Sequence, residues 1–352
     1  MPRLLDQWSS LWPALAFLLA GVPLADLLGR LGFFDSVAVV MLGRGHRQRS
    51  VLGLWVLAGL TTAVLNLDTT IVLLTPLCLR LARHSGIDDP LAVAAVPLFM
   101  ASFASSVLPI SNLTTLIVVQ RFDVNAFDVL SHLALPSVAA SLVGWLVYRL
   151  RHPRWLAADV TQSPDRRALG TGGTVVGGLL VGFMFGPQLG VDAWVVALAA
   201  DVVLMVVVRT VPWREVPLMT ALGVAAIAAA IAVVVPEAAL KAPLNNSGVA
   251  SVGVLAVAAA GLANAVNNLP ALLIGADALT HMSWGMWAWL LGVNVAAVLV
   301  PVGALANLLW LRIMRANGIR VRLRRYLHLT VPVALPATVA AIAVLMIERA
   351  IR

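Results

Sequence analysis

The chain has 352 residues, of which 61% are hydrophobic and 11% are charged, against about 25% charged residues in an ordinary soluble domain. This composition excludes a water-soluble protein and places most of the chain in a lipid bilayer. The formal net charge is +8, but the basic residues cluster in short segments between apolar runs. Such clusters are typical of membrane orientation signals, so no nucleic-acid partner is expected. The single cysteine, Cys78, excludes an internal disulfide and a multi-thiolate metal site.

The apolar runs predict ten membrane elements. The first follows a single arginine and lacks a small-residue cleavage site, so we expect a retained helix and not a signal peptide. Two elements, 50–84 and 248–280, are about twice as long as one crossing requires and have polar residues in their middle. In chain order the elements are 11–34, 50–84, 91–120, 128–150, 171–188, 191–210, 214–235, 248–280, 285–316 and 326–349.

Basic residues stand at both ends of the element 50–84, which predicts that both ends face the cytoplasm. A segment that enters and leaves on one side is a re-entrant helical hairpin, and its polar turn must be buried in protein or line a cavity. We place this turn near Asn66-Leu67-Asp68. The element 248–280 has no basic residue at either end, so it is predicted to be a hairpin that enters from the outside.

The distribution of arginines tests this topology. With two hairpins, the chain starts outside, crosses the membrane eight times and ends outside. Most of the 24 lysines and arginines then lie on the cytoplasmic side, as the positive-inside rule requires. The basic residues left outside are Arg3, Arg121, Lys241, Arg349 and Arg352.

The second half of the sequence repeats two motifs of the first half. The stretch 63–67 (AVLNL) matches 265–269 (AVNNL) at the hairpin turns, and 108–113 (LPISNL) matches 300–305 (VPVGAL) in the element after each hairpin. Pro109 and Pro301 each remove a backbone donor, so both elements are predicted to break near mid-membrane.

These features predict an all-α polytopic membrane protein with inverted-topology repeats, each with a re-entrant helical hairpin and a broken transmembrane helix. The predicted units are a first repeat (1–150), a cytoplasmic linker (151–170), a scaffold helix pair (171–210) and a second repeat (211–352).

Inverted repeats place binding sites at the membrane midplane, where the N-termini of half-helices point at oxygen-rich ligands. The polar residues there include no arginine or lysine, which favours a small polyhydroxy or weakly charged solute over a di- or tricarboxylate. Alternatively, prolines and asparagines only kink and join helices. The candidate solute- or ion-binding residues are Asn66, Asp68, Thr69, Thr70, Ser111, Asn112, Thr114, Thr115, Asn264, Asn267, Asn268, Asn294, Gly303 and Asn307.

Asp68 is the candidate for proton coupling, because an unpaired carboxylate at membrane depth is costly and must be protonated or paired. Asp26, Asp201 and Asp277 are either functional or structural partners of helix-end arginines. The sequence has no metalloprotease, nucleophile-elbow or Walker motif, so an enzyme and a cofactor are not expected. A gradient of H⁺ or Na⁺ is the expected driving force.

These motifs resemble the arsenite permease branch of the ion transporter superfamily, which is related to divalent-anion/sodium symporters. The resemblance implies a homodimer with an elevator-type motion of the hairpins and broken helices against a scaffold. It implies proton-coupled export of neutral arsenite or antimonite through the bacterial cytoplasmic (inner) membrane, and it admits a separate ATPase subunit as a partner. The stretches that carry it are 66–70 (NLDTT), 74–76 (LTP), 108–113 (LPISNL), 266–270 (VNNLP), 301–306 (PVGALA) and 309–310 (LW).

The sequence also departs from that branch. Its members usually carry two more helices before the position of Met1 and an acidic residue within the segment that is 101–106 here. Asn294 stands where they tend to have aspartate, Ala296-Ala297 replaces Gly-Pro, and Ala304 replaces a serine. Two alternatives therefore stay open: a sodium-coupled symporter of a carboxylate or another anion, and a transport-incompetent membrane partner subunit.

Overall fold

The protein is described by a computed structural model that covers residues 2–42, 45–84, 87, 89–152, 155–160, 163–234 and 238–352. Within these residues it is helical apart from one short pair of strands, which confirms the predicted class of polytopic helical membrane protein. Five helical segments are long and apolar enough to cross a bilayer by length and composition: Trp12–Arg30, Ala126–Arg151, Arg166–Phe185, Val249–Val266 and Leu323–Ile351.

The chain begins with helix α1 (Pro2–Arg30), which ends at a turn where Gly32 has a φ of 78°. Such a left-handed conformation costs glycine little, because glycine has no Cβ. The turn leads into α2 (Phe33–Leu42), a helix that the apolar pattern did not predict.

The predicted first hairpin is present as α3 (Val51–Val64) and α4 (Leu67–His84). After it the chain forms the short helices α5 (Leu91–Ala94) and α6 (Val96–Phe103), leaves helical structure, and resumes as α7 after a 3₁₀ turn. This is the first broken helix. The remaining elements of the first half are η1 (Pro109–Ser111), α7 (Leu113–Phe122) and α8 (Ala126–Arg151).

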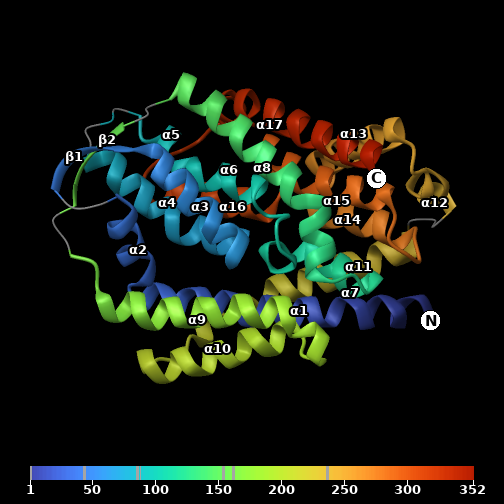
Figure 1. Cartoon of the computed structure of the whole chain (residues 1–352), viewed down its shortest axis with the longest axis horizontal. Coiled ribbons are helices and arrows are strands. Elements are labelled where there is room, and N and C mark those ends of the chain that lie inside the picture. The colour runs from blue at the N-terminus through green and yellow to red at the C-terminus, as the bar shows by residue number, and fades with distance from the viewer. Residues whose placement is uncertain are drawn as a thin grey trace.

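A helix pair connects the two halves. It consists of α9 (Arg166–Phe185) and α10 (Ala193–Val208), which lie along α1 (Figure 1). The 3₁₀ turn η2 (Pro187–Leu189) lies between these two helices, and the next elements are η3 (Trp213–Glu215), α11 (Leu218–Val234) and α12 (Ala238–Asn245).

The second half repeats the order of the first. Its hairpin is α13 (Val249–Val266) with α14 (Asn268–Asp277), and its broken helix is α15 (Trp284–Val295) with α16 (Leu305–Ala316). The 3₁₀ turns η4 (Ala296–Leu299) and η5 (Pro301–Gly303) lie at the break, and α17 (Leu323–Ile351) ends the chain.

Strand β1 (Gly45–Ser50) pairs antiparallel with β2 (Trp155–Val160), with Gly45 opposite Val160 and Ser50 opposite Trp155. This pair was not predicted. It joins the segment before the first hairpin to the segment between α8 and α9, at one end of the molecule (Figure 1).

The hairpins and broken helices lie between α1, α9 and α10 on one side and α8 and α17 on the other (Figure 1). An aromatic cluster packs the first half: the ring of Trp55 on α3 lies 6.0 Å from Phe99, 6.2 Å from Phe103 and 5.5 Å from Tyr148. Because these rings come from α3, α6 and α8, the cluster fixes the first hairpin against its broken helix and α8.

Candidate functional site

Each hairpin turns at an asparagine that caps the next helix. The Asn66 Oδ1 atom accepts a 2.7 Å hydrogen bond from the backbone N–H of Thr69, and Asn267 Oδ1 accepts a 3.2 Å bond from Leu269. An asparagine oxygen at this position satisfies one of the free N–H groups at a helix start. The caps therefore orient the N-termini of α4 and α14 at the two tips.

The sequence repeat and the structure differ by one residue at these tips. Val64 and Val266 end α3 and α13 in register, but two residues precede α4 and only Asn267 precedes α14. Asn267 has a φ of 89°, a strained conformation for a residue with a side chain. Asn267, and not Asn268, therefore takes the structural place of Asn66.

The two helix breaks have the same backbone path. Leu108 and Val300 have φ and ψ of −127°, 154° and −124°, 147°, and each precedes a proline that begins a 3₁₀ turn. Asn112 and Ala304 return the chain to helix at −151°, 136° and −147°, 153°. The motifs around Pro109 and Pro301 thus form equivalent structures.

At the two breaks, different side chains donate hydrogen bonds to the backbone carbonyls that the interrupted helix leaves without a helical partner. In the first half, Ser111 Oγ lies 2.8 Å from the carbonyl oxygen of Ser105 and 2.5 Å from that of Leu108. In the second half, Asn307 Nδ2 donates to the equivalent carbonyls of Ala297, at 2.8 Å, and Val300, at 3.0 Å. Gly303 occupies the place of Ser111, and a Cβ there would collide with the Ala297 carbonyl oxygen.

Asn264 also holds the second break. Its Nδ2 donates to the carbonyl of Ala296 at 2.9 Å, and its Oδ1 accepts from the N–H of Val300 at 3.0 Å. Since buried backbone groups must find partners, Asn264 and Asn307 are used to stabilise the broken backbone, and Gly303 leaves the space that the break requires.

Asn294 joins the two broken helices. Its Oδ1 accepts from Asn112 Nδ2 at 3.1 Å and from Thr114 Oγ1 at 2.6 Å, and its Nδ2 donates to Ser106 at 3.0 Å and Thr115 at 3.2 Å. Asn294 is 1% exposed and uses the full hydrogen-bonding capacity of its amide. It therefore has no free group for a solute in this conformation.

A cavity of about 490 Å³, here called the inner chamber, lies where four helices begin. The first residues of α4, α7, α14 and α16 line it, among them Leu67, Leu113, Asn268 and Leu305. A helix N-terminus carries about half a positive charge and points free N–H groups outward. The chamber therefore favours oxygen-rich or anionic ligands. Of the described residues that line it, only Asp68 has an ionisable side chain.

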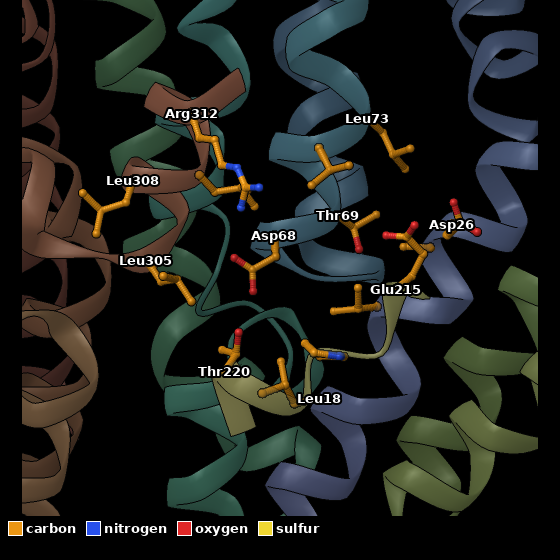
Figure 2. Close-up of a pocket in the computed structure, with 15 residues that line it drawn as sticks. Leu18, Asp26, Asp68, Thr69, Leu73, Glu215, Thr220, Leu305, Leu308 and Arg312 are labelled. Carbon is orange, nitrogen blue, oxygen red and sulfur yellow. The ribbon is translucent and has the colours of Figure 1, made fainter. Parts of the chain in front are cut away.

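A second cavity of about 510 Å³, here called the outer cavity, adjoins the inner chamber (Figure 2). Asp68, Leu18, Thr220 and Leu305 line both cavities. Arg312, Glu215 and Asp26 line only the outer cavity. Asp68 thus stands at the junction between a charged cavity and a nearly uncharged chamber. Its Oδ1 atom is buried and has no hydrogen-bond partner within the described part of the chain.

The structure separates the predicted site residues into two groups. Six line a cavity: Asp68, Thr69, Asn112, Thr114, Asn267 and Asn268. The others are not among the described lining residues: Asn66, Thr70, Ser111, Thr115, Asn264, Asn294, Gly303 and Asn307. Thr70 belongs to a buried hydroxyl pair, in which Thr62 Oγ1 donates to Thr70 Oγ1 at 2.9 Å.

Sequence reasoning missed Arg312, Glu215 and Thr220. The signal for Arg312 was available, because Leu305, Leu308, Leu309 and Arg312 are spaced as one face of a helix and all four line the outer cavity. No arginine or lysine is among the described residues that line the inner chamber, whereas Arg312 lines the outer cavity.

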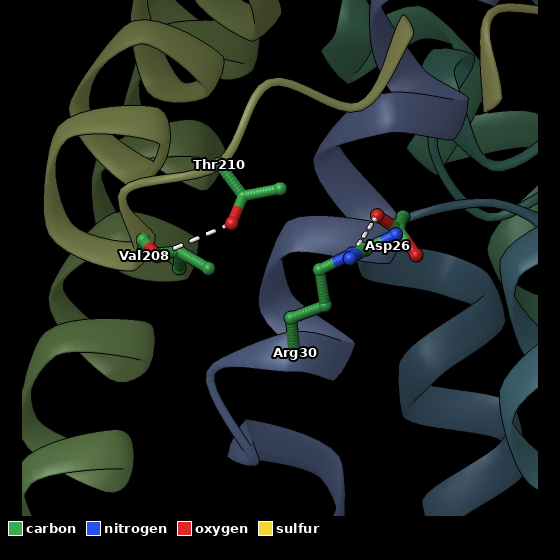
Figure 3. A network of polar contacts seen from close by, with 4 residues as sticks. All are labelled: Asp26, Arg30, Val208 and Thr210. Atoms are coloured by element: carbon green, nitrogen blue, oxygen red, sulfur yellow. Dashed lines mark hydrogen bonds and ion pairs between the residues drawn. The ribbon is translucent and has the colours of Figure 1, made fainter. Parts of the chain in front are cut away.

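The sequence singled out three acidic residues besides Asp68, namely Asp26, Asp201 and Asp277. Two of them have arginine partners. Asp26 Oδ2 lies 2.5 Å from Arg30 Nε, near the chain segment where Thr210 donates to the Val208 carbonyl (Figure 3). Asp277 Oδ1 lies 3.3 Å from Arg121 Nη2. Asp201 is 1% exposed, and its Oδ1 has no hydrogen-bond partner among the described residues.

Comparison with known proteins places the chain among membrane transporters. Residues 7–303 match the CitMHS family, described as "Citrate transporter". The arsenical pump membrane proteins of Escherichia coli strain K12 and Yersinia enterocolitica are each 24% identical to this chain, and the alignments cover 97% of this chain and 87% of each relative.

The fold has a known counterpart. The crystal structure of the YdaH transporter of Alcanivorax borkumensis, described as having an unusual topology, superposes with a TM-score of 0.57 and 15% sequence identity. The superposition covers 98% of this chain and 86% of that structure. The family match, which spans most of the sequence, shows that this chain belongs to the CitMHS family of multi-pass membrane transporters and is not an enzyme.

Proposed function

We propose that this protein exports arsenite or antimonite, as the neutral hydroxide, across the bacterial cytoplasmic membrane in exchange for protons. The observation that carries this proposal is the inner chamber, where four helix N-termini and the neutral side chains of Asn112, Thr114, Asn267 and Asn268 surround a space with Asp68 as its one acid among the described lining residues. A neutral trihydroxy solute can donate hydrogen bonds to amide and hydroxyl oxygens and accept them from helix N–H groups.

The charge of the chamber supports a weakly charged cargo. No lysine or arginine is among the described residues that line it, whereas a bound di- or tricarboxylate usually requires arginine side chains. The relatives named as arsenical pump membrane proteins support the same cargo.

Asp68 is the proposed proton carrier. It lies in the first turn of α4 and lines both cavities, so protons and solute can reach one carboxylate from either space. A proton bound at Asp68 and a solute bound beside it would weaken each other's binding. Exchange of protons for solute requires this competition.

Expression in an arsenite-sensitive bacterial strain tests the proposal. We expect the wild type to give resistance, Asp68→Asn to lose it, and everted vesicles with the wild type to accumulate arsenite only under a proton gradient. Asp123→Asn is the matched control, because Asp123 is exposed, lies outside both cavities and has a φ of 50°, which asparagine tolerates. Full resistance from Asp68→Asn would refute the proton role, and absence of resistance from well-expressed wild type would refute the cargo.

A second function, sodium-coupled import of a carboxylate, is favoured by one observation: Arg312 lines the outer cavity next to Asp68. The description of the matched family, citrate transporter, agrees with it. Uptake of labelled citrate into proteoliposomes with and without a sodium gradient decides between the two. Sodium-independent or absent uptake removes this function. Absence of flux for both solutes favours the remaining alternative, a membrane partner subunit.

A further inference from the structure

Asp68 and Arg312 share the outer cavity although they are far apart in the sequence. Asp68 is in the first turn of α4, and Arg312 is two turns along α16 from Leu305, which lines both cavities. Figure 2 shows both side chains extending into the same space, with the Arg312 guanidinium toward Asp68. The two helices pack against each other.

Neither group has an ionic partner within the described residues in this conformation. Asp68 Oδ1 has no hydrogen-bond partner, and no ion pair joins Arg312 to a described carboxylate. The other acids of the cavity are Asp26, which is paired with Arg30, and Glu215, which is exposed.

We infer that Arg312 is the counter-charge that receives the Asp68 carboxylate when it releases its proton into the outer cavity. Arginine stays charged at all relevant pH values and has a long flexible side chain, and α4 and α16 pack against each other with both residues lining one cavity. The O–H bond of the carboxyl breaks, the proton passes to water in the outer cavity, and the ion pair neutralises the charge that remains.

The ion pair would give the carrier a second state. With a protonated Asp68 the guanidinium is not paired with this carboxyl group, and with an ionised Asp68 an ion pair joins the side chains of α4 and α16. Arg312 thus acts on Asp68 and not on the solute, which makes it a positioning residue. This inference rests on the proposed proton coupling, but it makes a prediction about the two side chains that needs no solute.

Thermal unfolding of the purified full chain tests it without transport. The variants are Asp68→Asn, Arg312→Gln and the double variant, each measured at pH 8 and pH 5. We expect the two single effects to be non-additive at pH 8 by on the order of 2 °C, and we expect this non-additivity to shrink at pH 5, because protons compete with Arg312 for the carboxylate. Additivity at both pH values, or the same coupling at both, overturns the inference.

Two control pairs show whether the coupling is specific to Asp68 and Arg312. Arg315→Gln removes an exposed arginine from the same helix outside the described cavity lining, and it should be additive with Asp68→Asn. The second pair is Arg312→Gln with Glu215→Gln. If these two effects are non-additive while Arg312→Gln and Asp68→Asn are additive, Glu215 is the partner of Arg312 and the inference is overturned. Should Arg312→Gln fail to fold, Arg312→Lys keeps the charge, and it should retain the coupling at pH 8.

Flux gives the second readout. In vesicles that transport the solute, Arg312→Gln should move the pH of half-maximal flux upward by about one unit, since an opposite charge beside the carboxylate is lost, whereas Arg312→Lys and Arg315→Gln should not. An unchanged pH profile in Arg312→Gln overturns the inference even if arsenite is transported. If no variant moves solute, the proposed function fails and the unfolding experiment still decides the role of Arg312.

Discussion

Thr114 on α7 and Asn294 on α15 are joined by a 2.6 Å hydrogen bond, in which the Thr114 hydroxyl donates to the Asn294 side-chain oxygen. This bond is one of four that connect the broken helix of the first half to that of the second. The candidate site is therefore built on a contact between the two halves.

Replacing Asn294 with leucine should destabilise the fold. The change keeps the approximate size but leaves Asn112, Thr114, Ser106 and Thr115 without their partner in a buried position, at a cost of about 2–4 kcal/mol. Thermal unfolding in detergent measures it. Asn294→Asp should keep more of the Tm, because the hydroxyls of Ser106 and Thr115 can rotate to donate to a carboxylate. Asn245→Leu, at an exposed position, is the control, and equal Tm values for Asn294→Leu and this control would contradict the prediction.

Gly303→Ala should also lower the Tm. A Cβ at Gly303 would collide with the carbonyl oxygen of Ala297 and approach the side-chain oxygen of Asn264, so the backbone of the second break must shift at a cost of about 1–3 kcal/mol. Gly261→Ala is the matched control, because a Cβ there meets no atom within 4 Å and alanine favours helix. A Gly303→Ala protein as stable as Gly261→Ala would show that the break has room for a methyl group.

The ion pair of Arg121 and Asp277 should contribute more than an exposed pair. Their side chains are 20% and 4% exposed, and Asp277→Asn leaves a partly buried arginine without its charge partner, at about 3 kcal/mol. The control is Asp35→Asn, because Asp35 and Arg80 are 61% and 62% exposed and pairs of this kind contribute little. Unfolding of both variants gives the comparison, and similar Tm losses would refute it.

His152 should make stability depend on pH. It follows α8, its Nε2 is buried without a described partner, and its ring lies 4.9 Å from Tyr148. Burial, with a smaller contribution from the charge of Arg151, lowers the pKa of His152 below 6.5. The folded state thus favours the neutral ring. The contribution of His152 to the free energy of unfolding is therefore present above about pH 6.5 and is lost as the pH falls.

The difference in Tm between wild type and His152→Gln should therefore shrink between pH 7.5 and pH 5. His281→Gln, at an exposed histidine, should show a constant difference over the same range. A constant difference for His152→Gln as well would refute the role of His152.

The architecture was predictable because its signals are local. Arginines at both ends of 50–84 and prolines at 109 and 301 mark hairpins and breaks without any knowledge of tertiary contacts. The pairing of β1 with β2 was not predictable in this way, because it joins a segment before the first hairpin to a segment after α8, far away in the sequence.

The candidate site was predictable only in part. A polar residue at membrane depth indicates a need for a partner, but the sequence does not tell whether that partner is a solute or a carbonyl that a break has freed. Asn264 and Asn307 turned out to bond carbonyls, whereas Asp68, Asn267 and Asn268 line cavities. Arg312 was overlooked because it was counted as an orientation signal and not placed on a helix face.

The four helix N-termini around the inner chamber limit how related proteins can change the solute that they transport. Their electrostatic potential comes from peptide groups, so no single side-chain substitution removes it and no change of pH discharges it. Attraction for oxygen-bearing solutes is thus a property of the fold that all its variants inherit. Selectivity among such solutes is left to the few side chains at the tips and to Asp68, where one substitution is enough to alter the charge of the whole chamber.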